Sequence, residues 1–323
     1  MSFFASLASR VFQGFALVLA VIVLNFVLVH AAPGDPVETI AGASGGMSPE
    51  LMAQLRTQYG LDKPFLVQLG IYLGKVATGD FGYSYFFNLP VTALIFERIP
   101  ATLLLVISAV FSAFLIGTAL GVLSARRPNG PLSQFINVLS LVGFAAPVFW
   151  TGIMLVILFA SVLPILPVSG MRGAAASGEG WSDVVDVLWH LILPTLMLAL
   201  VYLAQYSRLA RSSMLDVLGS DFIRTARAKG LAERVVLYKH ALRNAVLPVV
   251  TVLGLQFGNV LAGAILVETV FNWPGLGRLA FESVLRRDYP TILGVLVFSS
   301  MVVIVMNLLT DLAYRLIDPR IKV

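Results

Sequence analysis

Cysteine is absent from this 323-residue sequence, and histidine occurs only three times, at His30, His190 and His240. Without cysteine there can be no disulfide, thiolate metal site or cysteine nucleophile. The histidines lie far apart in different segments, so they indicate neither a zinc site nor a nucleophile–base pair. We therefore predict no catalytic, metal-binding or cofactor-binding residue on this chain.

Phosphate-binding loops and buried charges are also lacking. The nearest approach to a P-loop is "GIYLGKV" at residues 70–76, but its glycine spacing is wrong and Val76 stands where Ser or Thr should bind magnesium. The long apolar runs contain no charged residue well away from an end. Ion-coupled carriers usually need such residues near the middle of the bilayer. The chain is therefore predicted to be neither an ATPase nor a secondary transporter.

Apolar residues are abundant, at 58% of the sequence, and the mean hydropathy is +0.90. A membrane-spanning helix needs about 20 mostly apolar residues. Six runs meet that requirement: residues 11–30, 101–123, 135–163, 188–206, 246–267 and 291–314. We predict an all-α polytopic membrane protein with six transmembrane helices, a kink at Pro147 and a bend at Pro194. The first run exceeds the usual apolar core of a signal peptide, so a retained helix is favoured over a cleaved leader.

The excess of basic residues, a net charge of +5, gathers at the ends of the apolar runs. That distribution favours an orientation signal over nucleic-acid binding. Arg10, Arg126, Arg127 and the basic segment after residue 207 fall on one side when the N-terminus is inside. Both termini are therefore predicted to be cytoplasmic.

Residues 31–100 separate the first two runs and are too polar to lie within a membrane. In "SPELMAQLRTQYG", Ser48 can cap a helix, Pro49 suits its first position and Gly60 can end it. A second amphipathic helix should follow Pro64. We predict a small helical cap on the outer surface, which is either a docking or gating element or an ordinary solvated loop.

The most distinctive stretch is "DFIRTARAKGLAERVVLYKHALRNAVLP", residues 221–248. Ser220 or Asp221 can cap a first short helix, and Gly230 can end it or permit a sharp turn. A second short helix should begin near Glu233, so that both lie along the inner membrane surface. Ala226, Ala228 and Gly230 would let another backbone approach closely. These features alone are compatible with two interpretations: a protein-docking loop, or a basic helix that binds anionic lipid.

This stretch resembles the cytoplasmic coupling loop of permease subunits in binding-protein-dependent ABC importers. Arg224, Thr225 and Ala226 occupy the E-A-A positions of that loop, and Gly230 its glycine. The departures from the general pattern resemble the dipeptide, oligopeptide and nickel branch. Other segments similar to that branch follow in the expected order: "HAAPGDP", "YGLDKP", "GDFGYS", "SRLARSSMLDVL", "LAGAILVETVFNWPGLG" and "RRDYP".

The resemblance implies a type I importer permease with an N-terminal transmembrane helix at 1–30, a periplasmic helical loop at 31–100 and a five-helix core at 101–323. The coupling loop would occupy about residues 207–245. A second homologous permease, two ABC ATPases that bind ATP and Mg, and a periplasmic solute-binding protein would be its partners in a bacterial inner membrane, with lipid around it. The ATPase-coupling loop would include Asp221, Arg224, Thr225, Ala226, Arg227, Ala228, Gly230 and Glu233. Thr225, Ala226, Arg227, Ala228 and Gly230 would contact the ATPase, and Asp221 and Glu233 would orient the helices. An outer docking or gating turn would comprise Trp273, Pro274, Gly275 and Gly277.

The expected cargo is a di- or oligopeptide. Nickel or a peptide-like solute such as glutathione is the alternative within the same type of complex. A stand-alone channel or facilitator is a rival from another class, in which the basic loop would only touch lipid, and a structural membrane scaffold is a second.

Overall fold

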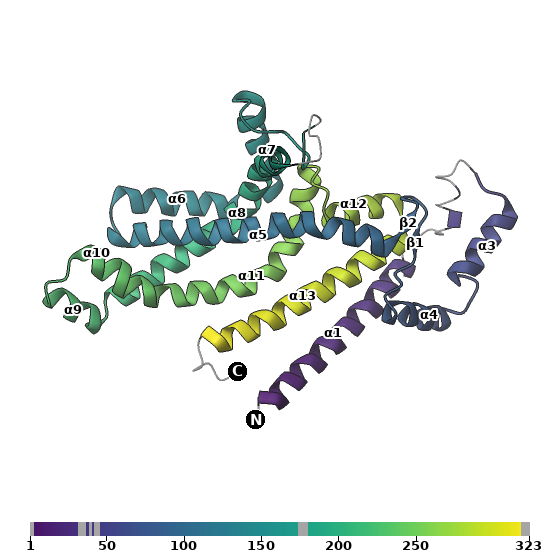
Figure 1. Ribbon diagram of the computed structural model, residues 1–323, viewed down its shortest axis with the longest axis horizontal. Coiled ribbons are helices and arrows are strands. Elements are labelled where there is room, and N and C mark those ends of the chain that lie inside the picture. The colour runs from purple at the N-terminus through teal and green to yellow at the C-terminus, as the bar shows by residue number, and fades with distance from the viewer. Residues whose placement is uncertain (1–2, 32–36, 39–40, 42–45, 174–179, 318–323) are drawn as a thin grey trace. The chain divides into compact units, whose positions relative to one another are not determined.

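Helices account for nearly all of the regular structure, as the sequence predicts (Figure 1). The computed structural model describes residues 3–31, 37–38, 41, 46–173 and 180–317. The chain divides into two units, one formed by Met1–Ala101 with Pro274–Leu308 and the other by Thr102–Trp273 with Leu309–Val323. Two long helices, α5 (Val91–Arg126) and α13 (Tyr289–Ile317), run from one unit into the other.

The first unit contains α1 (Phe3–Ala31), α3 (Pro49–Tyr59), α4 (Phe65–Ala77) and α12 (Leu276–Arg286). The local signals of the predicted outer helices are confirmed in α3. The Ser48 hydroxyl accepts a hydrogen bond from the Leu51 amide at 3.3 Å, Pro49 is the first helical residue, and Gly60 ends the helix with φ of 68°. The second helix, α4, follows Pro64 as expected.

A two-stranded hairpin lies between α4 and α5, and the sequence did not predict it. Strand β1 (Tyr83–Ser84) pairs antiparallel with β2 (Leu89–Pro90). The Ser84 hydroxyl donates to the buried carboxylate of Asp288, which also accepts from the Thr291 hydroxyl at 2.7 Å. The hairpin is thereby attached to the first turn of α13, 204 residues away along the chain.

The second unit is built around α8 (Trp181–Leu218), which contacts α6 (Pro131–Ala145), α7 (Val148–Val156) and α11 (Leu242–Val270). The second half of α5 packs closely against α8 at Gly117 and Gly121. A methyl group on Gly121 would lie 2.5 Å from the Ser207 carbonyl oxygen and 2.6 Å from the Ala210 Cβ. Only glycine lets the two backbones approach this closely, which is a common device in membrane helices.

Proline acts differently at the two predicted bends. At Pro147 the run 135–163 is divided into α6 and the segment Val148–Val162, which meet at 108°. The break is far sharper than the predicted kink. Proline disfavours the helical conformation in the residue before it, so the chain leaves the helix there. Pro194, in contrast, lies inside the uninterrupted helix α8, where it is buried.

Three helices of the described part are long and apolar enough to cross a membrane: Val91–Arg126, Trp181–Leu218 and Tyr289–Leu308. The bent pair Pro131–Gly143 and Val148–Val162 adds a fourth if it forms one span. The remaining apolar runs lie in α1 and α11, which are both helical. The protein is thus a polytopic helical membrane protein, and the count of six spans stays a prediction.

Candidate functional site

The basic stretch forms a short helix, α9 (Asp221–Ala228), that leaves the end of α8. Ser220 occupies the predicted cap position, with φ of −75° and ψ of 155°. Its hydroxyl does not cap the helix but donates to the Val217 carbonyl oxygen at 2.6 Å. The helix ends at Ala228, and Gly230 follows with φ of 75°, a conformation that disfavours other residues. The predicted turn at Gly230 is confirmed.

The inner face of α9 is fixed to the long helices. Ile223 is fully buried and Ala226 is 7% exposed, three residues along the same face. Both belong to one apolar cluster, whose other buried members are Val122 and Ala125 of α5, Met214 of α8, and Val236, Leu237, Ala241 and Ala245 of the following segment. A displacement of α9 would therefore be passed directly to the ends of α5, α8 and α11.

The outer face of α9 carries most of the predicted coupling residues. The exposed members on α9 are Asp221, Arg224, Thr225, Arg227 and Ala228, and Gly230 and Glu233 are exposed in the residues that follow it. Arg224 lies 3.3 Å from the Asp221 carboxylate, and the Thr225 hydroxyl donates to the Asp221 carbonyl oxygen at 3.0 Å. Ala226 differs from the others because it faces the buried cluster. It anchors the helix, and its predicted contact with an ATPase stays a prediction.

An ion pair closes the turn that follows α9. The Arg227 guanidinium donates to both carboxylate oxygens of Glu233, at 2.8 and 3.2 Å. This hydrogen bonding lowers the pKa of Glu233 below its ordinary value and raises the pKa of Arg227. The two groups expose 44% and 63% of their side chains, so the pair orders the loop and adds little to global stability. The expected orienting role of Glu233 therefore has a geometric basis.

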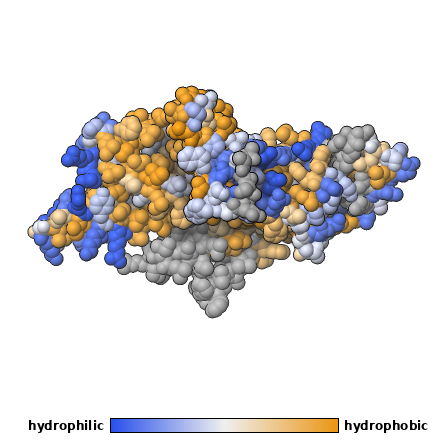
Figure 2. All heavy atoms as spheres, turned by 45° about the horizontal axis from the view of Figure 1, so that its top comes forward, coloured by the Kyte–Doolittle hydropathy of each residue, from blue (hydrophilic) through white to orange (hydrophobic). Residues whose placement is uncertain are grey.

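Exposed apolar side chains surround these charges, and the sequence did not predict them. Phe222, Leu231, Val235 and Tyr238 are each 38–48% exposed. In Figure 2 the end of the molecule where Figure 1 places α9 and α10 (Glu233–Val235) is mainly hydrophilic, with a few apolar residues among the charges. Large apolar groups amid charged ones are typical of a protein-binding surface.

The segment after the turn differs from the predicted second short helix. Helix α10 continues into a π-helix, η2 (Val236–Ala241), and then directly into α11. Because Val236, Leu237 and Ala241 are buried in the apolar cluster, the chain is drawn onto the ends of α5 and α8. Only α9 remains a separate helix, and the prediction of two short helices is wrong in this respect.

The predicted outer turn at Trp273–Gly277 is mostly buried. Trp273 is fully buried, and its amide donates to the Glu268 carbonyl oxygen at 2.8 Å. Gly275 and Gly277 are buried too, whereas Pro274 is partly exposed. The burial gives Trp273 a packing role, and contact between this turn and an outer partner stays a prediction.

Sequence comparison places nearly the whole chain within described families. Residues 117–323 match the family described as "Binding-protein-dependent transport system inner membrane component". Residues 3–106 match "Binding-prot-dependent transport system membrane comp, N-term".

Individual relatives match over almost their full length. The dipeptide transport system permease protein DppB of Escherichia coli K12 is 42% identical over 322 residues, which cover 94% of each chain. The oligopeptide transport system permease protein AppB of Bacillus subtilis is 40% identical over 98% of this chain and 99% of its own. A putative peptide permease of Brucella suis is 43% identical over 97% of this chain and 98% of its own.

A solved structure shares the fold. The inward-facing MetNI methionine ABC transporter contains a chain that matches with a TM-score of 0.55 and 16% identity, over 70% of this chain and 96% of that chain. At this identity the match supports the fold and not the cargo.

Proposed function

This chain belongs to the family of binding-protein-dependent transport system inner membrane components, and from that premise we propose that it is the permease subunit of an ATP-driven importer of di- or oligopeptides. The cargo assignment rests on relatives that are about 40% identical over nearly the whole chain and carry dipeptide or oligopeptide names. No catalytic role falls to this chain, since ATP and Mg would be bound by separate ATPase subunits.

The observation that carries the proposed mechanism is the two-sided character of α9. Its inner residues, Ile223 and Ala226, are buried among side chains of α5, α8 and the start of α11. Its outer residues offer charges and exposed apolar groups to a partner. A helix held in this way moves together with the helices that it packs against. Packed interiors shift between discrete arrangements and do not deform continuously. ATPase closure would push α9 and thereby tilt the spans.

The remaining parts of the complex follow from this role. A second, homologous permease would complete the translocation path, and a periplasmic binding protein would deliver the peptide to the outer side. The exposed face of α9 and both termini would lie in the cytoplasm of a bacterium, with the chain in the inner membrane. The charge distribution of the sequence supports this orientation.

Cross-linking from a single cysteine tests the α9 contact. The native chain has no cysteine, so Ala228→Cys introduces its only thiol, at an exposed position. In native membranes a short bifunctional thiol–amine reagent should join Cys at this position to an ABC ATPase, which mass spectrometry would identify. Asn129→Cys is the matched control, because it is exposed in the α5–α6 loop and lies outside α9.

Capture of the ATPase by Ala228→Cys, with much less capture by Asn129→Cys, supports the coupling role. Cross-links to lipid alone from a correctly inserted Ala228→Cys chain would refute it and would favour a channel or facilitator. The cargo is tested separately in proteoliposomes that contain the isolated complex. ATP-dependent accumulation of a labelled dipeptide, and not of Ni²⁺, is the expected result.

A further inference from the structure

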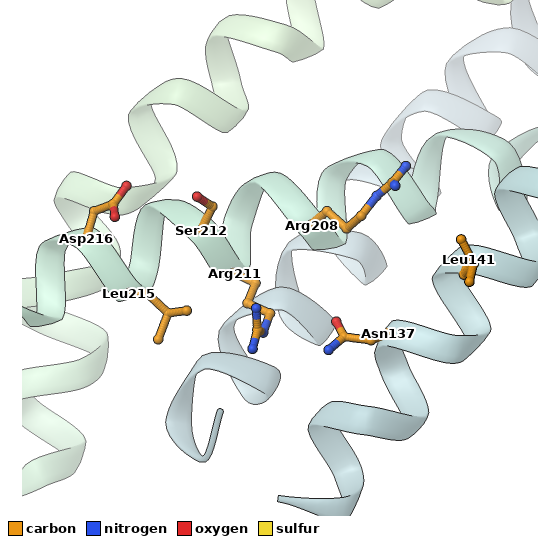
Figure 3. A pocket seen from close by; sticks show the side chains of 7 residues that line it. All are labelled: Asn137, Leu141, Arg208, Arg211, Ser212, Leu215 and Asp216. Atoms are coloured by element: carbon orange, nitrogen blue, oxygen red, sulfur yellow. The ribbon is translucent and has the colours of Figure 1, made fainter. Parts of the chain in front are cut away.

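An open groove of about 520 Å³ lies between α6 and α8, apart from the outer face of α9. It is lined by Asn137 and Leu141 of α6 and by Arg208, Arg211, Ser212, Leu215 and Asp216 of α8. Figure 3 shows Arg211 of α8 and Asn137 of α6 pointing into the space between the helices, whereas Asp216 and the guanidinium of Arg208 point away from Arg211. The centre of the groove is therefore polar and cationic.

Arg211 is poorly satisfied within the chain. Its Nε is buried and has no hydrogen-bond partner among the described residues. One terminal nitrogen donates to the Pro128 carbonyl oxygen at 3.4 Å, which is long for a hydrogen bond. A buried donor without a partner is costly, and a guanidinium is suited to bind phosphate through two parallel hydrogen bonds. An anion in the groove would therefore give the Arg211 guanidinium the acceptor that it lacks. The one acidic residue that lines the groove, Asp216, points away from Arg211.

The surroundings of the groove are apolar. Among the side chains of α6 that the structure describes, the buried ones form a narrow stripe of Ser133, Ile136 and Ser140. Its large apolar side chains are exposed by 43–63%, namely Leu132, Phe135, Val138, Leu139, Leu141 and Val142. Leu141 belongs to both the groove and this apolar face. In Figure 2 the region of α6 is largely orange and is bordered by a blue band at the end nearer α9 and α10.

We propose that the groove between α6 and α8 binds an anionic phospholipid. Its phosphate accepts hydrogen bonds from Arg211, with Arg208 one turn away on α8 as a second cation and Asn137 as a neutral donor. The acyl chains lie along the apolar face of α6. A cationic, partly buried pocket joined to an exposed apolar helix matches the two halves of such a lipid, whereas a free anion would use only the first half. Bound lipid would then fix α6 against α8, the helix that leads into α9.

Photolabelling tests this site in the intact complex. The complex is placed in phosphatidylcholine vesicles that contain a trace of phosphatidylglycerol with a diazirine on its acyl chain, and labelled peptides are quantified by mass spectrometry. Label is expected on residues 131–145. Unlabelled phosphatidylglycerol should compete with the probe, and additional phosphatidylcholine or inorganic phosphate should not.

Two variants test the cationic part and the apolar part of the groove separately. Arg208→Gln/Arg211→Gln should reduce labelling about tenfold or more, because charge-assisted hydrogen bonds to the phosphate are lost. Leu141→Trp keeps both charges and fills the groove from an exposed position, so it should also displace the probe while leaving the fold intact. Arg234→Gln/Lys239→Gln removes the same charge from exposed positions next to α9 and should label like the wild type.

Several results would overturn the proposal. Equal labelling by a phosphatidylcholine probe would mean that α6 only touches bulk lipid. An equal loss in Arg234→Gln/Lys239→Gln would assign the effect to general surface charge. Displacement by inorganic phosphate would make the groove a site for a free anion. Absence of label from a wild-type complex that transports peptide would mean that a protein covers this face.

Discussion

The guanidinium of Arg227 binds both carboxylate oxygens of Glu233 across the turn at Gly230. The two residues are six positions apart, and the positive φ of the glycine brings them together. The pair thereby joins the end of α9 to the start of α10 and holds the exposed residues of this turn in one arrangement.

Removal of the carboxylate should loosen this turn without unfolding the protein. In Glu233→Gln the bidentate pair is lost, yet both groups are solvent-exposed, so the free energy of unfolding should fall by less than about 1 kcal/mol. Peptide uptake in proteoliposomes should fall several-fold, because α9 is no longer held for the ATPase. Glu38→Gln removes a carboxylate whose long contact with Arg56, 3.8 Å, lies elsewhere, and it should leave uptake unchanged. Normal uptake by Glu233→Gln would contradict a coupling role for the pair.

The same pair predicts a pH dependence. Arg227 lowers the pKa of Glu233, so the stabilisation is present above the ordinary carboxyl pKa and is lost as the pH falls through the lowered value. The difference in melting temperature between wild type and Glu233→Gln should therefore be largest near neutral pH, should shrink as the pH falls below the ordinary carboxyl pKa, and should vanish below the lowered pKa of Glu233. A difference that grew toward low pH would show that the carboxylate is not the stabilised form.

Gly230 should tolerate residues according to backbone preference. Its φ is 75°, and a Cβ there would meet no atom within 4 Å, so strain and not crowding limits substitution. Asn adopts this conformation more readily than other non-glycine residues. Gly230→Asn should keep most of the uptake, whereas Gly230→Trp should insert normally but hydrolyse ATP without accumulating peptide. Unchanged uptake by a correctly inserted Gly230→Trp protein would count against the assignment of this loop.

Two glycine-to-alanine substitutions should have opposite effects on stability. In Gly121→Ala the new methyl group meets the Ser207 carbonyl oxygen at 2.5 Å, so α5 and α8 must separate, at a cost of about 1–3 kcal/mol. In Gly74→Ala on α4 the methyl group meets nothing, and better helix propensity should stabilise by about 0.5–1 kcal/mol. Thermal unfolding in detergent measures both. A stable Gly121→Ala protein would mean that the close contact is not maintained.

Orientation can be read from two exposed positions on opposite sides of the predicted membrane. A membrane-impermeant maleimide should label Ser169→Cys in intact spheroplasts, because the loop that follows the third apolar run, 135–163, lies outside when the N-terminus is cytoplasmic. Ala228→Cys should react only after the membrane is permeabilised. The reverse pattern would place α9 outside and would exclude contact with a cytoplasmic ATPase.

Local signals in the sequence predicted much of the structure correctly, because backbone preference and hydrophobicity act over a few residues. The predicted apolar runs form helices. Helix α3 begins after the cap residue Ser48, with Pro49 in its first position, and ends at Gly60. Gly230 forms the turn after α9. Resemblance supplied the family and the prediction of which residues contact an ATPase. These predictions do not depend on which helices pack against one another.

Only the tertiary structure decided which side of each residue is covered. Ala226 faces inward and its neighbours outward because the buried cluster lies against one face of α9. Burial in that cluster merges the expected second helix into α11, and Trp273 is withdrawn from the surface. The hairpin at Tyr83–Pro90 is held by Asp288, about 200 residues farther along the chain. Such contacts join segments distant in sequence, so no local pattern of residues encodes them.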